Sequence, residues 1–173
     1  MKKSTKPILI SPAGNWTCLT AALQQNTDAI YFGLKELNMR LNTNNFKAAE
    51  LAKIANICHK NKAQAFLALN SIIFDHELRT VENIIKKAKK AGIDAVICCD
   101  ISIIRLCKKH KIPFHISTQA SISNYESLEF YSKLGAQYAV LARELTLEQI
   151  KKIITKAKKK MLKIRIETFI HGA

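Results

Sequence analysis

The sequence predicts an α/β fold, a parallel (β/α) barrel of the TIM-barrel-like type. Apolar runs of strand length alternate with segments of helical period from one end of the chain to the other. Strict alternation of strand and helix favours parallel strands joined by right-handed crossovers. We find no G-x-G-x-x-G after the first strand and no G-x-x-x-x-G-K phosphate loop, so the sequence favours a barrel over a nucleotide-binding open sheet.

The expected elements follow one another in regular order. We expect about seven strands, near residues 8–13, 29–33, 63–70, 95–100, 113–118, 138–143 and 164–170. We expect about six helices, near residues 16–26, 47–61, 76–91, 102–110, 124–134 and 147–160. A complete eight-stranded barrel usually needs about 250 residues. We therefore expect residues 1–173 to form a single domain that is an incomplete barrel, the N-terminal portion of one.

A weak internal repeat marks the turns that lead from helix to strand. The segments NTDAIYFG, GIDAVICC and GAQYAVLA each combine a helix end, a short turn and an apolar strand. Gly92 and Gly135 fit the left-handed residue that closes a helix, and Asn26 can take the same position. These turns belong to the amino-terminal end of a parallel barrel, where the structural loops lie.

Two helix starts are predicted at the opposite end of the barrel. Ser123 with Glu126, and Thr146 with Gln149, have the spacing of capping boxes. Both pairs follow an expected strand closely. The segments between strand end and helix start hold most of the unusual polar residues.

The composition limits the protein class. The net charge is +15, with lysine runs of the kind that solvated helix faces carry, although a basic surface also attracts RNA. No stacking aromatics are interleaved with the lysines, so a dedicated nucleic-acid module is not indicated. We expect no membrane span, because no apolar run approaches 18 residues. The five cysteines lack a C-x-x-C and suit small buried residues in a reducing cytoplasm.

The candidate site consists of polar residues and one glycine near the carboxy-terminal ends of the strands, where parallel α/β folds bind ligands. We assign catalytic roles to Gln119, Arg143, Glu144, Glu167 and His171. We assign substrate binding to Gly14, Asn38, Arg40, Asn70, Asp100, His115 and Ser117. We expect no metal ligands among them.

The charged candidates suggest binding and proton transfer. Arg40 and Arg143 can hold a carboxylate or phosphate by two hydrogen bonds. Glu144 or Glu167 can act as acid or base if burial raises its pKa. Arg143 with Glu144 or Glu167 can equally be a structural salt bridge. In YAVLARELTLEQ, residues 138–149, strand alternation places only one of Arg143 and Glu144 toward the barrel axis.

The other candidates also allow two interpretations. Asn70 and Gln119 can hydrogen-bond a ring edge or a carbonyl, and His171 can carry a proton. Asn70 and Asn124 can instead be turn or cap residues, and Asp100 can be the cap of the next helix. Gly14 in SPAG lets a ligand approach the backbone, or is only part of a turn.

A peptidase constellation is weakly represented. His115 and Ser117 lie two residues apart and should face the same side of a strand, but they do not make a triad. Cys58 and His59 are expected on a helix, on a face that does not reach the strand ends. The chain has no H-E-x-x-H motif of a metalloprotease. His115 can also be an ordinary core histidine.

Taken together, several segments resemble one protein family. Seven segments occur in order over nearly the whole chain: SPAGNW, DAIYFGLKELNMR, LALNSIIFDHEL, GIDAVICCD, HISTQASISN, VLARELTLEQI and ETFIHGA. They resemble the N-terminal half of the collagenase-like peptidases, peptidase family 32 of unknown catalytic type. The combination of these motifs is specific, whereas any one of them alone is not.

The resemblance implies one of two activities. Some family members are named for proteolysis, whereas others look like iron–sulfur hydroxylation proteins that act on RNA bases or on a ubiquinone precursor. In the latter, a four-iron four-sulfur cluster is held by cysteines that begin just beyond the HGA motif. None of the five cysteines here matches those positions, so we expect no cofactor within this chain and a cluster only if cysteines follow Ala173.

Hydroxylation is the activity we favour for the parent family, with a peptidase as the alternative. We expect RNA or a small aromatic molecule as substrate, and a cytoplasmic location. A third interpretation is a truncated remnant or one half of a split protein, inactive alone and completed by a partner chain at the exposed edge of the seventh strand.

Overall fold

Residues 6–35 and 45–171 are described by the computed structural model. Within them, seven parallel strands form one sheet in sequential order. The strands are β1 (Ile10–Pro12), β2 (Ala29–Gly33), β3 (Gln64–Leu69), β4 (Ala95–Cys98), β5 (Phe114–Ile116), β6 (Tyr138–Val140) and β7 (Arg165–Glu167). The helices are α1 (Trp16–Gln24), α2 (Leu51–Lys60), α3 (Leu78–Lys90), α4 (Ile101–Lys109), α5 (Tyr125–Leu134) and α6 (Leu147–Lys159). Short 3₁₀ helices cover Ala48–Glu50, Asp75–Glu77 and Thr118–Ala120.

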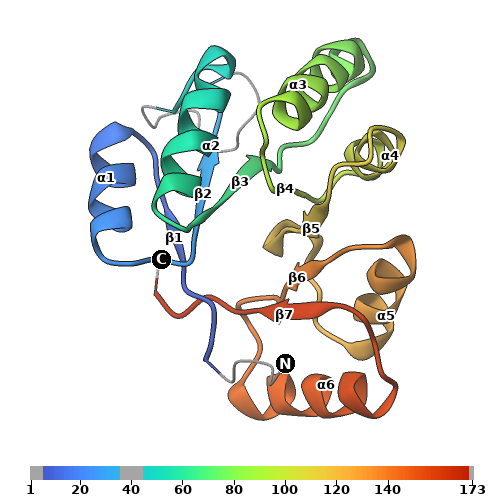
Figure 1. The fold of residues 1–173 in the computed structure, drawn as a ribbon. Helices are drawn as coiled ribbons and strands as arrows, with labels where there is room; N and C mark the ends of the chain where they lie inside the picture. Colours follow the sequence, from blue (N-terminus) through green and yellow to red (C-terminus); the bar gives the residue numbers. More distant parts are fainter. Residues whose placement is uncertain (1–5, 36–44, 172–173) are drawn as a thin grey trace.

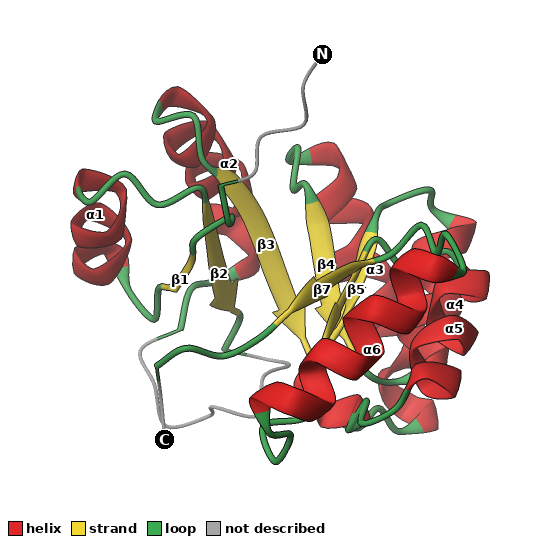
Figure 2. Ribbon diagram, turned by 90° about the horizontal axis from the view of Figure 1, so that it is seen from below, coloured by secondary structure: helices red, strands yellow, loops and turns green. Residues whose placement is uncertain are grey.

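The sheet curls into a half-barrel with the helices on its outside (Figure 1). Each helix connects one strand to the next strand of the sheet, so the strands all run the same way (Figure 2). The fold class predicted from the alternating pattern is therefore confirmed. None of the helices in the described part of the chain is long and apolar enough to span a membrane.

Most of the core lies between the sheet and the helices. Ile30 and Leu67 of the sheet pack in one apolar cluster with Ile54 of α2 and Ile85 of α3, all fully buried. Burying one such side chain contributes about 1.5–3 kcal/mol. The opposite face of the sheet points to the barrel axis and carries a smaller cluster, centred on Phe66. Strand alternation produces this division, because successive side chains point to opposite faces.

All six turns from helix to strand contain a left-handed residue. The three that the sequence predicts, Asn26, Gly92 and Gly135, have φ values of 56°, 80° and 97°. Lys62, Lys111 and Met161 occupy the equivalent positions, with φ between 52° and 60°. They were not predicted, because lysine and methionine have no preference for this conformation.

Hydrogen bonding explains why these unusual residues are accepted. After α2, the amide of Ala63 donates to the carbonyl of Cys58, and after α4 the amide of Ile112 donates to Cys107. The same bond closes α6, from Leu162 to Ala157. This is the Schellman pattern, in which the left-handed residue is followed by an apolar one that packs back on the helix. Burial of that apolar residue holds the turn in place.

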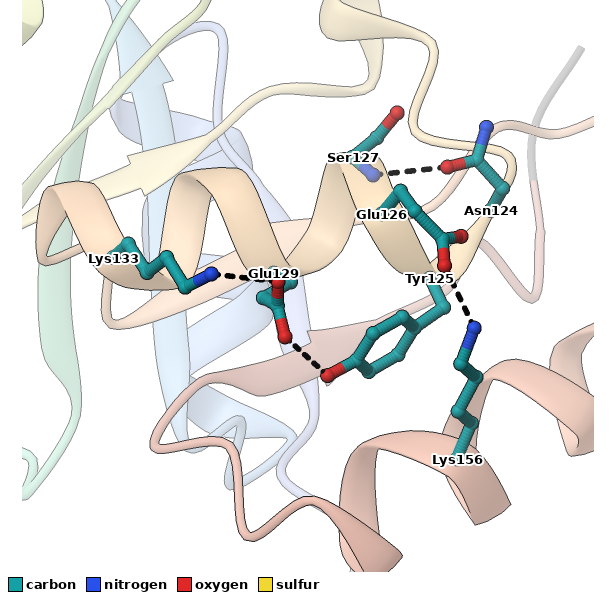
Figure 3. Close-up of polar contacts among 7 residues, drawn as sticks. All are labelled: Asn124, Tyr125, Glu126, Ser127, Glu129, Lys133 and Lys156. Atoms are coloured by element: carbon teal, nitrogen blue, oxygen red, sulfur yellow. Dashed lines mark hydrogen bonds and ion pairs between the residues drawn. The ribbon is translucent and has the colours of Figure 1, made fainter.

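The prediction for the start of α6 is confirmed and that for α5 is wrong. Thr146 accepts from the amide of Gln149, whose side chain accepts in return from the amide of Thr146. In α5, however, the cap is Asn124, whose side chain accepts from the amide of Ser127 at 2.9 Å, and not Ser123 (Figure 3). Asn and Ser cap equally well, so the residue in the extended conformation next to the helix takes the role.

A cluster of polar and aromatic side chains joins α5 to α6 (Figure 3). The ammonium of Lys156 lies 2.7 Å from the carboxylate of Glu126 and 4.2 Å from the centre of the Tyr125 ring. The Tyr125 hydroxyl donates to Glu129, and this bond raises the pKa of Tyr125 to about 12. These contacts fix the two helices against each other beside β6 and β7.

The later strands end sooner than the apolar runs suggest. The expected strands 95–100, 113–118, 138–143 and 164–170 are ordered as strands only over 95–98, 114–116, 138–140 and 165–167. At two ends the chain turns away because the next polar residue begins a helix. Asp100 caps α4, and Ser117 caps the 3₁₀ helix that follows β5.

Candidate functional site

The carboxy-terminal ends of β3 to β7 form a continuous rim held by hydrogen bonds between successive strands. The thiol of Cys99 donates to the carbonyl of Asn70, and the amide of Ser117 donates to the carbonyl of Cys98. The amide of Leu141 donates to the carbonyl of Glu167. These bonds bring the segments that follow the strands to one edge of the sheet, as the sequence predicts for a parallel fold.

Glu167 is a titratable candidate at the rim; the residue is half-buried and its carboxyl is partly enclosed. It is the last residue of β7 and pairs with Val140, so it lies on the face of the sheet that is turned to the barrel axis. Its Oε2 atom is buried and has no hydrogen-bond partner in the described residues. Burial raises the pKa of this carboxyl to about 7. A carboxyl of this kind can take up and release a proton near neutral pH.

Two polar atoms at the end of β3 are also buried without a partner. They are Oδ1 of Asn70 and Oγ of Ser71, again within the described part of the chain. Buried polar groups are normally hydrogen-bonded, so unpartnered ones at a strand end indicate a place for a ligand atom or water. Asn70 was a candidate, whereas Ser71 was missed because a serine after a strand looks like an ordinary turn residue.

Asp100 and Ser117 both have structural roles at the rim. Asp100 accepts from the amide and hydroxyl of Ser102 at 2.7 Å, as expected of the cap of α4. Its other oxygen accepts from the amide of Ile73 at 3.3 Å and holds the loop after β3. Ser117 is 3% exposed and accepts from the amide of Gln119, whose own side chain is exposed.

His115 lies deeper in the interior than the rim. It is 1% exposed, and its ring centre lies 4.6 Å from that of Phe66 and 4.5 Å from that of Tyr138. Burial lowers its pKa to about 4, so the imidazole is neutral. His115 and Ser117 fall on one side of the strand, as expected, but no hydrogen bond joins them. Within the described residues they do not form a nucleophile–base pair.

The remaining candidates lie in exposed or peripheral positions. Arg143 and Glu144 are both exposed, in the turn between β6 and α6. Because β6 ends at Val140, strand alternation does not decide which of the two faces the axis. A Cβ on Gly14 would meet no atom within 4 Å, so the protein itself does not require glycine there. His171 is exposed, and Asn38 and Arg40 lie outside the described residues.

A cavity of about 300 Å³ opens at the other end of the half-barrel. It was not predicted, because sequence reasoning concentrated on the carboxy-terminal ends of the strands. A signal was nonetheless present in the sequence, since polar residues stand at or just before the starts of β3, β4, β6 and β7. The residues that line it are Gln64, Phe66, Asp94, His115, Gln137, Tyr138, Lys163 and Arg165.

The described residues do not fit an iron–sulfur cluster. No three His, Cys, Asp or Glu side chains among them gather as a metal site would require. Burial raises the pKa of Cys58 to about 11, and contact with Cys107 together with burial raises that of Cys98 well above its ordinary value. Cluster ligands are thiolates, whereas these cysteines are protonated members of the core.

Comparison with known proteins identifies the family. The model of peptidase family U32 matches residues 14–173, so the chain belongs to this family. It is 40% identical over 165 residues to an uncharacterized protease of Methanocaldococcus jannaschii, covering 95% of this chain and 40% of that protein. It is 36% identical over 172 residues to a collagenase of Porphyromonas gingivalis, covering 95% of this chain and 41% of that protein.

Other relatives carry names from RNA modification. The tRNA hydroxylation protein P1 of Bacillus subtilis is 32% identical over 170 residues, covering 97% of this chain and 39% of that protein. Among solved structures, a U32 peptidase superposes with a TM-score of 0.74 at 12% identity, covering 97% of this chain and 70% of that chain. That likeness supports the fold. The chain thus spans about two fifths of the length of the protease, the collagenase and the tRNA hydroxylation protein that it matches in sequence.

Proposed function

We propose that this chain is the substrate-positioning barrel of a U32 protein that hydroxylates a base in RNA. The observation that carries the proposal is the chemistry of the rim. The rim carries a carboxyl whose pKa burial raises to about 7, Glu167 on β7, and buried oxygens of Asn70 and Ser71 after β3 that have no partner among the described residues. Such a set suits the hydrogen-bonding edge of a heterocycle and the movement of one proton. It does not supply the nucleophile and base of acyl transfer.

The roles follow from these properties. Asn70 and Ser71 would hydrogen-bond the polar edge of the base, since each has a buried side-chain oxygen that forms no hydrogen bond with any described residue. Glu167 would accept or return a ring proton. Hydroxylation replaces C–H by C–OH and so also needs an oxygen source and an electron acceptor. We assign neither of these to the described residues.

The relatives and the charge support RNA as the substrate. Relatives named for tRNA hydroxylation and for 23S rRNA 5-hydroxycytidine synthesis align with 95–97% of this chain. The net charge of +15 favours a polyanion over a small neutral substrate. Five cysteines without a disulfide fit the reducing cytoplasm, where RNA is modified.

The test is a comparison of cellular RNA with and without the gene. We expect a deletion strain to lack one hydroxylated nucleoside, detected by mass spectrometry of digested tRNA and rRNA. The full gene should restore it, and Glu167→Gln should not, although the variant protein accumulates normally. Unchanged nucleosides in the deletion strain would refute the proposal. A changed quinone pool with unchanged RNA would favour the quinone-precursor alternative.

Proteolysis remains the second candidate because of two relatives. The chain is 40% and 36% identical to proteins that are named as a protease and a collagenase. Gelatin and collagen cleavage by the native protein tests it directly. If Ser117→Ala abolished cleavage while the melting temperature stayed the same, His115 and Ser117 would have to be reconsidered as catalytic.

A further inference from the structure

Exposed lysines lie at three successive helix ends, and on two of the turns that follow them, at the amino-terminal end of the sheet. The helices are α2, α3 and α4, which are neighbours on the outside of the half-barrel (Figure 1). Because the strands are parallel, these turns lie at the end opposite the candidate site. We call the following exposed residues the lysine rim: Lys60, Lys62, Lys89, Lys90, Lys108 and Lys111.

Contacts between the turns make the lysine rim one surface. The Nε2 atom of His59, at the end of α2, lies 2.8 Å from the carboxylate of Asp94 in the next turn. The ammonium of Lys89, at the end of α3, donates to the carbonyl of Lys111 at 2.8 Å. The three turns are therefore fixed relative to one another.

The positive charge of the lysine rim is not neutralised locally. None of the six lysines forms an ion pair with a carboxylate of the described residues. The two nearby carboxylates have other partners. Asp94 accepts from the amide of Ala65 as well as contacting His59, and Glu82 contacts Lys109 and His110 at 2.8 and 2.7 Å.

Helix dipoles do not account for the whole arrangement. A lysine in the last turn of a helix interacts favourably with the free carbonyls there. Among the described α-helices only α1 ends without a basic residue in its last turn, so the dipole accounts for the four rim lysines that lie within helix ends. However, Lys62 and Lys111 lie beyond the ends of their helices, on the turns. The lysine rim therefore includes residues of the turns as well as residues of the helix ends.

We propose that the lysine rim binds the phosphate backbone of RNA, away from the base that the opposite end receives. The proposal rests on RNA being the substrate, as proposed above. Strands of no more than six residues span about 20 Å, so a folded RNA is large enough to contact both ends of the barrel. Lysines contact phosphates as point charges and do not read sequence, so the rim anchors RNA of any sequence.

Two matched triple variants test this surface. Lys60→Gln with Lys90→Gln and Lys108→Gln removes three charges from the lysine rim. Lys35→Gln with Lys47→Gln and Lys151→Gln removes three exposed charges elsewhere. Binding of an unmodified tRNA transcript is measured by fluorescence anisotropy over 50–200 mM salt. Melting temperatures establish that each variant is folded.

The two variants should differ clearly. We expect the rim variant to bind at least about 10-fold more weakly than the native protein, with a log–log salt slope smaller by about 2, since each lost phosphate contact removes about 0.7–0.9. The control variant should bind within about threefold of the native protein. Lysine-to-arginine changes at the same three rim positions should leave binding intact.

Two outcomes would overturn the proposal. Equal weakening in both triple variants would mean that diffuse net charge, and not the lysine rim, attracts the RNA. Equally tight binding of inorganic polyphosphate, matched in phosphate concentration, would mean that the surface is not one for RNA. Binding by the purified protein is independent of hydroxylation in cells, so failure of the proposed activity would be seen separately, in the nucleoside analysis.

Discussion

The imidazole of His115 in β5 lies 4.5 Å from the ring of Tyr138 in β6, measured between ring centres. The ring of Phe66 in β3 lies 4.6 Å from the same imidazole, again between ring centres, in an edge-to-face arrangement. Three strands thus contribute one ring each to the axis-facing side of the sheet. This packing of rings buries the Nδ1 atom of His115, which has no hydrogen-bond partner in the part of the chain that the structure describes.

Acid should destabilise the protein through His115. Its pKa is about 4 when folded against 6.5 ordinarily, so the unfolded chain takes up the proton first. The stability contributed by the neutral ring is complete above pH 6.5 and is lost as the pH falls toward 4, by up to about 3 kcal/mol. We expect His115→Phe to flatten this part of the stability curve, measured by urea unfolding at pH 7.5 and 4.5. Parallel curves for the two proteins would contradict this.

Glu167 should show the opposite pH dependence. Its pKa rises from 4.5 to about 7 on folding, so the stability of its neutral form is complete below pH 4.5 and is lost as the pH rises through 7. Since the side chain is partly exposed, we expect Glu167→Gln to be more stable than the native protein by about 1–3 kcal/mol at pH 8.5. At pH 4 the two should be equal. A variant that is less stable at pH 8.5 would mean that the carboxylate has a stabilising partner.

A glycine should improve the turn after α6. Met161 has φ of 52° and is 84% exposed, so its side chain contributes little that offsets the backbone strain. We expect Met161→Gly to stabilise the protein by about 0.5–1 kcal/mol, because the left-handed conformation costs other residues 1–2 kcal/mol. The melting temperature measures the gain. The matched control, Met161→Ala, should produce no gain, since alanine keeps the Cβ.

Asp100 should be important for the structure beyond any contact with a substrate. Its carboxylate caps α4 and holds the amide of Ile73. We expect Asp100→Ala to lower the free energy of unfolding by about 1–2 kcal/mol, and Asp100→Asn to lower it less, because asparagine also caps helices well. Chemical denaturation compares the three proteins. Equal stability of the alanine variant would show that the cap is dispensable.

The prediction of the fold succeeded because its signals are local. Apolar runs bounded by Gly92 and Gly135 indicate where a strand begins, and Thr146 with Gln149 indicates where a helix begins. Such signals depend on a few neighbouring residues. The errors arose where two residues had the same local preference, as with Ser123 and Asn124, or where a residue without a preference for the left-handed conformation occupies the helix-closing position, as at Lys62.

The sequence by itself determined the order of the elements, the direction of the strands and the end of the sheet where polar residues gather. Only the tertiary structure decided which of those residues are enclosed. Arg143 and Glu144 are exposed because β6 ends before them, whereas Glu167 is enclosed because it is still paired with β6. Burial, and with it a raised pKa, depends on the register and length of neighbouring strands, which are set by contacts between residues far apart in the chain.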